Sequence, residues 1–105
     1  MDDVLNQRDL KTLIRRYADV LRKQMRIDAI YLFGSYARNK ADKFSDIDLL
    51  IVSPDFGDNL LENQLKLLRA RRGIDYRIEP HPVLPEDLDS SVLFTLASSE
   101  MRKIV

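Results

Sequence analysis

The 105-residue sequence predicts an α/β (α+β) fold in which a small mixed sheet is flanked by helices. Two kinds of pattern indicate this fold. Some stretches repeat apolar residues every three or four positions, as helices do, and others are short apolar or alternating runs, as in strands. They follow one another in the order helix, strand, turn, strand, helix, strand, helix. Because a 45% apolar chain of this length can bury one core, we expect a single domain over residues 1–105.

The first half of the chain begins with an amphipathic helix, predicted from Asn6 to Met25. Its apolar residues recur at spacings of three and four, which places one stripe on Leu10, Leu13, Ile14, Tyr17, Val20 and Leu21. A nearly continuous apolar run over 29–33 then predicts a strand that is covered on both faces. Gly34 ends this strand. Residues 35–39 are expected to form a short helical turn, which leads into a polar loop over 40–45.

The middle of the chain is predicted to hold the second strand and the second helix. The strand covers 46–52 and opens with two carboxylates, Asp46 and Asp48. The helix follows a turn-rich connection and covers 59–72, with Asp58 as its expected cap. Its apolar stripe is predicted to comprise Leu61, Leu65 and Leu68.

The last third of the chain is less regular. Residues 74–79 alternate between apolar and charged and predict a third strand. We expect regular pairing to be broken after it by Pro80, Pro82 and Pro85. Residues 85–88 resemble a helix start, and a short, weaker helix is expected over 89–98. Residues 101–105 fit either a terminal strand or a frayed tail.

Composition excludes several classes of protein. The 17 basic and 17 acidic side chains balance, which argues against broad binding to nucleic acid or to a membrane surface. The absence of cysteine and the single histidine, His81, exclude disulfides, thiolate sites and multi-histidine metal sites. The apolar runs at 29–33 and 49–52 are too short to span a bilayer, and no basic-then-apolar leader opens the chain. We therefore expect a soluble cytoplasmic protein.

The two carboxylates at the start of the second strand indicate a metal site. Because side chains alternate along a strand, Asp46 and Asp48 point to the same face, about 6–7 Å apart. Their mutual repulsion would be relieved by a divalent cation between them. Oxygen ligands suit Mg²⁺ or Mn²⁺, and Mg²⁺ is often bound by one or two carboxylates together with substrate phosphates.

The Gly34-Ser35 turn could provide the matching phosphate site. Glycine lets the backbone approach a ligand closely, and a helix start aims N–H groups at an anion. Each motif alone also has a structural explanation, because Ser35 could cap a helix and Asp46 could cap a turn. Their succession is more specific: an apolar strand, Gly34-Ser35, ten intervening residues, and then Asp46-Ile47-Asp48 at the head of another apolar strand.

The stretch over 34–52, GSYARNKADKFSDIDLLIV, resembles the signature of the nucleotidyltransferase superfamily related to DNA polymerase β. It resembles the minimal nucleotidyltransferase (MNT) subgroup in particular, and the resemblance covers about residues 29–88. One departure is Asn39, where the family often has glycine, but Asn tolerates unusual backbone angles well. The resemblance implies the nucleotidyltransferase fold and the transfer of a nucleoside monophosphate, expected to be AMP from ATP, to a hydroxyl group.

The resemblance also implies two Mg²⁺ ions, or Mn²⁺ in their place, held by Asp46, Asp48 and a third carboxylate. The Glu79-Pro80 stretch is similar to the family segment in which an acid precedes a Pro-Glu-Glu-like helix start. This makes Glu79 the expected third ligand, with Asp75 as the fallback. For either residue, a surface ion pair with a nearby arginine is the competing explanation.

The nucleotide is expected to be bound by Gly34, Ser35 and Arg38, although Arg38 could equally be a solvated loop charge. Minimal members of the family are often antitoxins paired with a HEPN-type ribonuclease toxin, and some transfer AMP onto a tyrosine of that toxin. The resemblance therefore implies an adenylyltransferase antitoxin that binds such a toxin through an exposed apolar patch. Two alternatives remain open: a non-catalytic module that neutralises its partner by contact, and a small-molecule (antibiotic) nucleotidyltransferase. The sequence leaves the oligomeric state undetermined.

Overall fold

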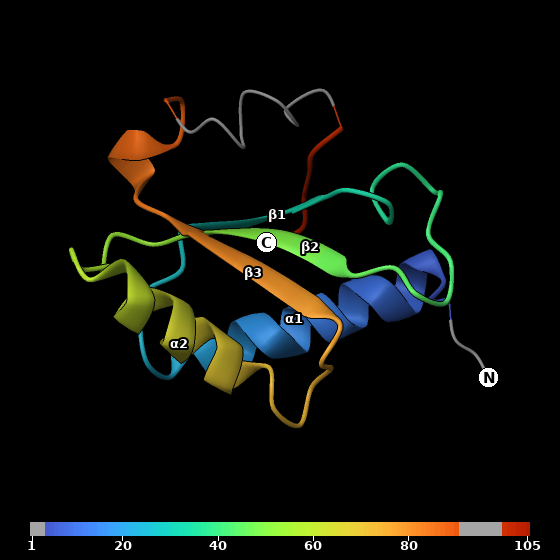
Figure 1. Ribbon diagram of the computed structural model, residues 1–105, viewed down its shortest axis with the longest axis horizontal. Coiled ribbons are helices and arrows are strands. Elements are labelled where there is room, and N and C mark those ends of the chain that lie inside the picture. The colour runs from blue at the N-terminus through green and yellow to red at the C-terminus, as the bar shows by residue number, and fades with distance from the viewer. Residues whose placement is uncertain (1–3, 91–99) are drawn as a thin grey trace.

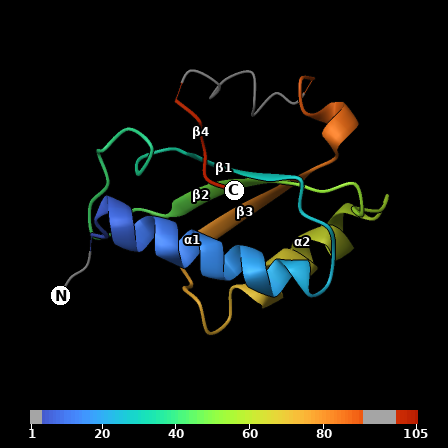
Figure 2. The ribbon, with the colours of Figure 1, turned by 180° about the vertical axis from the view of Figure 1, so that it is seen from behind.

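The computed structural model describes residues 4–90 and 100–105. Its sheet has four strands in the order β3-β2-β1-β4. The central strands β1 (Ala29–Phe33) and β2 (Ile47–Val52) pair antiparallel, and β3 (Ile78–Val83) pairs parallel to β2. The two-residue strand β4 (Arg102–Lys103) pairs antiparallel to β1 on the other side (Figure 2). The expected small mixed sheet flanked by helices is confirmed.

Both helices, α1 (Gln7–Arg22) and α2 (Leu60–Ala70), lie on the same face of this sheet (Figure 1). The short 3₁₀ helix η1 (Pro85–Asp87) lies on the other side, where a helix start was expected. None of the helices within residues 4–90 and 100–105 has the length and apolar character needed to cross a membrane. The expected helix over 89–98 falls almost entirely outside the described residues.

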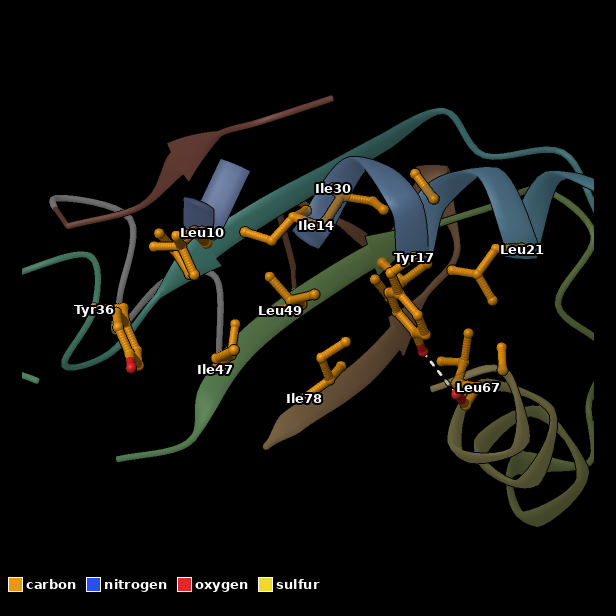
Figure 3. Packing of buried hydrophobic residues seen from close by; sticks show 14 of the residues in the cluster. Leu10, Ile14, Tyr17, Leu21, Ile30, Tyr36, Ile47, Leu49, Leu67 and Ile78 are labelled. Carbon is orange, nitrogen blue, oxygen red and sulfur yellow. Dashed lines mark hydrogen bonds between the residues drawn. The ribbon is translucent and has the colours of Figure 1, made fainter. Parts of the chain in front are cut away.

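The main core fills the space between the helices and the sheet (Figure 3). The sheet contributes alternate residues that point toward the helices, as the strand pattern predicts. From the helical side the core receives Leu10, Ile14, Tyr17, Ala18, Leu21, Leu67 and Ala70, and from the sheet it receives Ile30, Leu32, Ile47, Leu49, Ile51 and Ile78. Residues between these on the strands therefore face the opposite side, where the two acidic strand positions Asp48 and Glu79 lie.

The apolar stripe predicted for α2, Leu61, Leu65 and Leu68, is not the side of the helix that packs on the core. The helix buries Asn63, Leu67 and Ala70, whereas Leu61 and Leu65 are exposed. Asn63 can be buried because its side chain is satisfied, with Oδ1 accepting from the Gly57 N–H at 3.1 Å and Nδ2 donating to the Gly57 carbonyl at 2.8 Å. The cap also differs from the expectation, since the side chain of Asn59, not of Asp58, accepts from the Glu62 N–H at 3.0 Å.

The third strand begins later than predicted. Residues 74–77 form turns after α2, because the N–H groups of Ile74 and Asp75 donate to the Arg71 carbonyl, and pairing with β2 starts at Ile78. The strand then continues through Pro80 and Pro82, so the expectation that these prolines break the pairing is wrong.

The register explains why the prolines are tolerated. The Ile47 N–H donates to the Arg77 carbonyl and the Ser53 N–H to the Val83 carbonyl. The backbone N–H and C=O groups of odd-numbered β3 residues therefore point toward β2, and those of even-numbered residues point toward the free edge of the sheet. Proline lacks an N–H, and at this edge none is needed. The outward carbonyls are covered by side chains of α2 and its C-cap: Gln64 Nε2 donates to the Pro80 carbonyl at 2.9 Å, and Arg71 Nη1 donates to the Ile78 carbonyl at 2.8 Å.

Candidate active site

The site predicted from sequence lies on the sheet face opposite α1 and α2. Asp48 is the second residue of β2 and is paired in register with Phe33 on β1 and with Glu79 on β3. Neighbouring strands lie about 4.8 Å apart, so in-register side chains on one face are direct neighbours. The sheet thus brings together Asp48 and Glu79, which are 31 positions apart in the sequence, as the expected third-carboxylate assignment requires.

The carboxylates influence one another electrostatically. The pKa of Asp48 is raised from 3.8 to about 6, first by burial and then by the negative charges of Asp46 and Glu79, while the positive charge of Arg38 acts in the opposite direction. Asp46, immediately before β2, and Glu79, on β3, are therefore both close enough to Asp48 to act on its ionisation. A cation held among these oxygens would relieve the repulsion.

Gly34 lies directly against the Asp48 carboxylate. Its φ is 76°, and a Cβ built on it would collide with Asp48 Oδ2. Two separate reasons therefore require glycine here: the left-handed backbone angle and the space that the carboxylate occupies. The turn that starts at Gly34 is thus fixed next to the Asp48 carboxylate.

Residues 35–39 form the turn that follows Gly34. The Arg38 N–H donates to the Gly34 carbonyl at 3.1 Å, which is the i→i−4 bond of one helical turn, as expected. The Lys40 N–H then donates to the Ser35 carbonyl at 2.9 Å, and the segment does not continue as a regular helix. Asn39 has a φ of 58°, which explains how asparagine serves where glycine is common. Ser35 and Gly34 are both half-buried at the start of the turn.

The C-terminal segment holds this turn, a role that no sequence pattern indicated. Arg38 Nη1 donates to Glu100 Oε2 at 3.1 Å. Arg102 Nη2 donates to the Tyr36 carbonyl at 3.0 Å, and Arg102 Nη1 donates to Gln7 Oε1 at 2.9 Å. These partners are separated by more than sixty residues, beyond the reach of local motifs. Arg38 lies close enough to Asp48 for its positive charge to lower the pKa of that carboxylate, in agreement with its expected position beside the turn.

The fallback ligand Asp75 does not share the site face. It lies in the turn before β3, and its carboxylate accepts from Arg77 Nη2 at 2.7 Å and Arg77 Nε at 3.0 Å. Hydrogen bonds from Arg77 hold the pKa of Asp75 below its ordinary value. Of the two candidates, Glu79 is paired in register with Asp48, whereas Asp75 is occupied by Arg77. His81 lies on β3, as Glu79 does. Its ring packs against Phe33 with ring centroids 5.5 Å apart, and burial lowers its pKa.

The donor set fits Mg²⁺ in chemistry. Within the described part of the chain, no three acidic, histidine or cysteine side chains are already gathered closely enough to hold a metal by themselves. Asp48 and Glu79 nevertheless occupy adjacent positions on one face, and Asp46 is near enough to affect Asp48. Their oxygens are the ligands that Mg²⁺ prefers, and it ordinarily completes its coordination with water and substrate phosphates.

Comparison with known proteins identifies relatives of this arrangement. A family model described as "Nucleotidyltransferase domain" matches residues 14–99. A curated relative from Methanocaldococcus jannaschii, named "Putative protein adenylyltransferase MJ0128", is 35% identical over 51 residues, which are 46% of this chain and 52% of the relative. The chain thus spans about half the length of this relative.

Two solved structures share the fold. One is described as a toxin-antitoxin with AMP-PNP; it is 26% identical with a TM-score of 0.57, over 87% of this chain and 71% of that one. The other is described as a tri-AMPylated Shewanella oneidensis HEPN toxin in complex with MNT antitoxin. It is 22% identical with a TM-score of 0.55, over 91% of this chain and 71% of that one.

Proposed function

The chain belongs to the nucleotidyltransferase domain family, and from this premise we propose that it transfers AMP from ATP to a hydroxyl group of a protein, with Mg²⁺. The observation that carries the proposal is the placement of Asp48 beside Glu79 in register, with Gly34 cleared for the Asp48 carboxylate. A phosphate-binding turn and an acidic metal site thereby meet at one end of the sheet. The adenylyl group is suggested by the name of the curated relative.

Each residue has a distinct part in the proposed reaction. The acceptor oxygen forms a bond to the α-phosphorus, the bond from that phosphorus to the bridging oxygen breaks, and pyrophosphate leaves. Asp46, Asp48 and Glu79 would hold two Mg²⁺ ions, and when bound these ions would supply positive charge that lowers the pKa of the acceptor hydroxyl and offsets the charge on the leaving pyrophosphate. Gly34 and Ser35 present the turn to the phosphates, and Arg38 adds positive charge.

We propose a HEPN-type toxin as the acceptor protein. The described residues include no separate region that would form an acceptor pocket, and the curated relative is named as a protein adenylyltransferase. The two solved structures compared above are described as toxin-antitoxin complexes. A tyrosine hydroxyl of such a partner would approach from the sheet face that carries Asp48.

Label transfer tests the proposal. The protein is incubated with Mg²⁺ and ATP labelled at the α-phosphate, alone and with a HEPN protein encoded beside it. We expect label on the HEPN protein, and none with Asp48→Asn or Glu79→Gln. Asp75→Asn is the matched control, because its carboxylate pairs with Arg77 outside the acidic group, and it should keep transfer. Transfer that survives Asp48→Asn would contradict the mechanism.

Toxin neutralisation separates catalysis from contact. If the toxin is neutralised equally by Asp48→Asn and by the unaltered chain, inhibition occurs by binding and the enzymatic proposal fails. Label that appears on small molecules and on no protein would instead assign a small-molecule acceptor.

A further inference from the structure

The outer side of α2 carries a leucine stripe, which we define as Leu61, Leu65 and Leu68. Leu61 is 69% exposed and Leu65 is 38% exposed, while Leu68 is partly exposed. Their spacing of four and three places them along one side of the helix. The buried side of α2 consists of Asn63, Leu67 and Ala70, on roughly the opposite side. The helix therefore has an apolar side that the fold itself does not use.

The position of the stripe argues against its being where the acceptor docks. α2 packs on the sheet face that carries Ile47, Leu49 and Ile78, and the leucine stripe points away from that face. Asp48 and Glu79 alternate with these residues along their strands and therefore lie on the other face. A protein that presents a hydroxyl to the acidic group has to approach from the far side of the sheet. The stripe thus needs a different occupant.

The charges at the two ends of the stripe can be complemented by a second copy of this chain. Glu62 lies in the first turn of α2, where it forms an exposed ion pair with Lys66 at 3.7 Å, and Arg69 lies in the last turn on the same flank of the stripe. When two such helices are antiparallel and centred on Leu65, Leu61 of one copy meets Leu68 of the other. Glu62 of one copy then meets Arg69 of the other, twice by symmetry. Because the chain has no formal net charge, no overall repulsion opposes the association.

We propose that the leucine stripe is the contact of a symmetric homodimer in which two α2 helices pack antiparallel. A second copy, and not another protein, is the occupant because the pattern is self-complementary in both its leucines and its charges. The sheet face with Asp48 stays open in both copies. The contact is a single pair of short helices, so we expect a weak dimer whose population depends on concentration.

Sedimentation equilibrium of the full chain over a wide concentration range tests the dimer. We expect Leu65→Glu to raise the dimer Kd by more than about tenfold, because each copy would place an unpaired carboxylate in the contact. Leu60→Glu is the matched control: it puts the same charge on an exposed leucine of the same helix, but off the stripe. A chain that stays monomeric at all concentrations, or an equal effect of both variants, overturns the proposal.

Charge exchange tests the antiparallel orientation. Glu62→Arg alone should weaken the dimer, since it faces Arg69 of the second copy, and adding Arg69→Glu should restore it. In a parallel pair the flank that carries Glu62 and Arg69 would lie on opposite sides of the contact in the two copies, so these residues would not meet and the double variant would not recover from the single one. Failure to recover, with the fold intact by circular dichroism, overturns the antiparallel arrangement.

A single introduced cysteine locates the symmetry axis. The chain has no cysteine, so Leu65→Cys provides the only thiol. Leu65 lies at the centre of the proposed contact, and mild oxidation should join two copies there, whereas Leu60→Cys should remain monomeric. The result that would favour another occupant is a monomeric chain whose binding to a HEPN-type protein is lost with Leu65→Glu. This outcome overturns the homodimer but does not contradict the proposed transfer, which Asp48→Asn tests separately.

Discussion

Gly34 and Gly73 have nearly the same backbone conformation, with φ of 76° and 79°, but different surroundings. A Cβ at Gly34 would collide with the Asp48 carboxylate, and a Cβ at Gly73 would meet nothing within 4 Å. Alanine at either position should cost about 1–2 kcal/mol of stability, because both angles are left-handed. Only Gly34→Ala should also displace Asp48 and lose Mg-ATP binding.

Gly73→Ala is therefore the matched control for Gly34→Ala. Urea unfolding measures the loss of stability that both variants share because of their backbone angles. Isothermal titration calorimetry with Mg-ATP measures the loss of binding that is expected only for Gly34→Ala. Equal loss of Mg-ATP binding in both variants would show that the contact with Asp48 is unimportant. Sequence alone indicated Gly34 as a turn residue, and the structure adds the reason that is particular to this chain: the carboxylate occupies the space of a side chain.

The helix α2 shows what periodicity can and cannot predict. Spacings of three and four occur twice in this helix, in Leu61, Leu65 and Leu68 and again in Leu60, Asn63, Leu67 and Ala70. The sequence predicted a helix correctly, but it favoured the stripe with more leucines. The structure buries most of the other one, because the Asn63 amide is fully paired with Gly57 and Ala70 allows close packing. Side-chain hydrogen bonds of this kind leave no local signature.

The contact between α1 and α2 includes one buried hydrogen bond whose removal can be measured. The Tyr17 hydroxyl donates to the Leu67 carbonyl at 2.7 Å, near the end of α2 where helical carbonyls lack partners. Tyr17→Phe keeps the ring in the core but leaves this carbonyl unpaired, so we expect a loss of about 1–2 kcal/mol in the free energy of unfolding. Tyr76→Phe, at a largely exposed tyrosine, is the control and should change little. Equal stabilities of the two variants would contradict the assigned role of the hydroxyl.

The turn before β3 should make stability depend on pH. The Arg77 hydrogen bonds lower the pKa of Asp75 from its ordinary 3.8, so the folded protein binds this proton less readily than the unfolded chain. The resulting stabilisation is complete above the unfolded pKa and is lost as the pH falls through the lower folded pKa. We expect the unaltered chain to be more stable than Asp75→Asn at pH 7, with a difference that shrinks below about pH 4. Urea unfolding at several pH values measures this difference, and a gap that widens in acid would contradict the pairing.

At the scale of the whole molecule, the candidate site is assembled from segments that are distant in the sequence. Gly34, Asp46 and Asp48 lie in one continuous motif, and for this reason the sequence could place them. Glu79 was expected only from the family resemblance. The strand pattern itself predicted β3 too early, over 74–79, so it did not indicate which β3 residue pairs with Asp48. Glu100 and Arg102 were not predicted, because they act through contacts with residues more than sixty positions away. Contacts between residues that are distant in the sequence could not be predicted from local patterns.

Arg102 connects the start of α1 and the C-terminal strand to the turn over residues 34–39. Its guanidinium donates to Gln7 at the start of α1 and to the Tyr36 carbonyl, while its backbone pairs with β1. Arg102→Met retains much of the aliphatic stem and removes both hydrogen bonds, so we expect a loss of about 1–3 kcal/mol in the free energy of unfolding. The turn from Gly34 to Asn39 should also be held less firmly, which predicts weaker Mg-ATP binding even where the protein is fully folded.

Lys103→Met is the control for Arg102→Met, because Lys103 is the exposed neighbour in the same strand. Thermal unfolding compares stability, and Mg-ATP titration well below the melting temperature compares affinity among folded molecules. Lower stability with unchanged affinity would mean that Arg102 only joins the ends of the chain. A loss in both measurements, absent from Lys103→Met, is expected if the C-terminal strand positions the turn beside Asp48, because holding that turn in place beforehand lowers the entropy cost of binding.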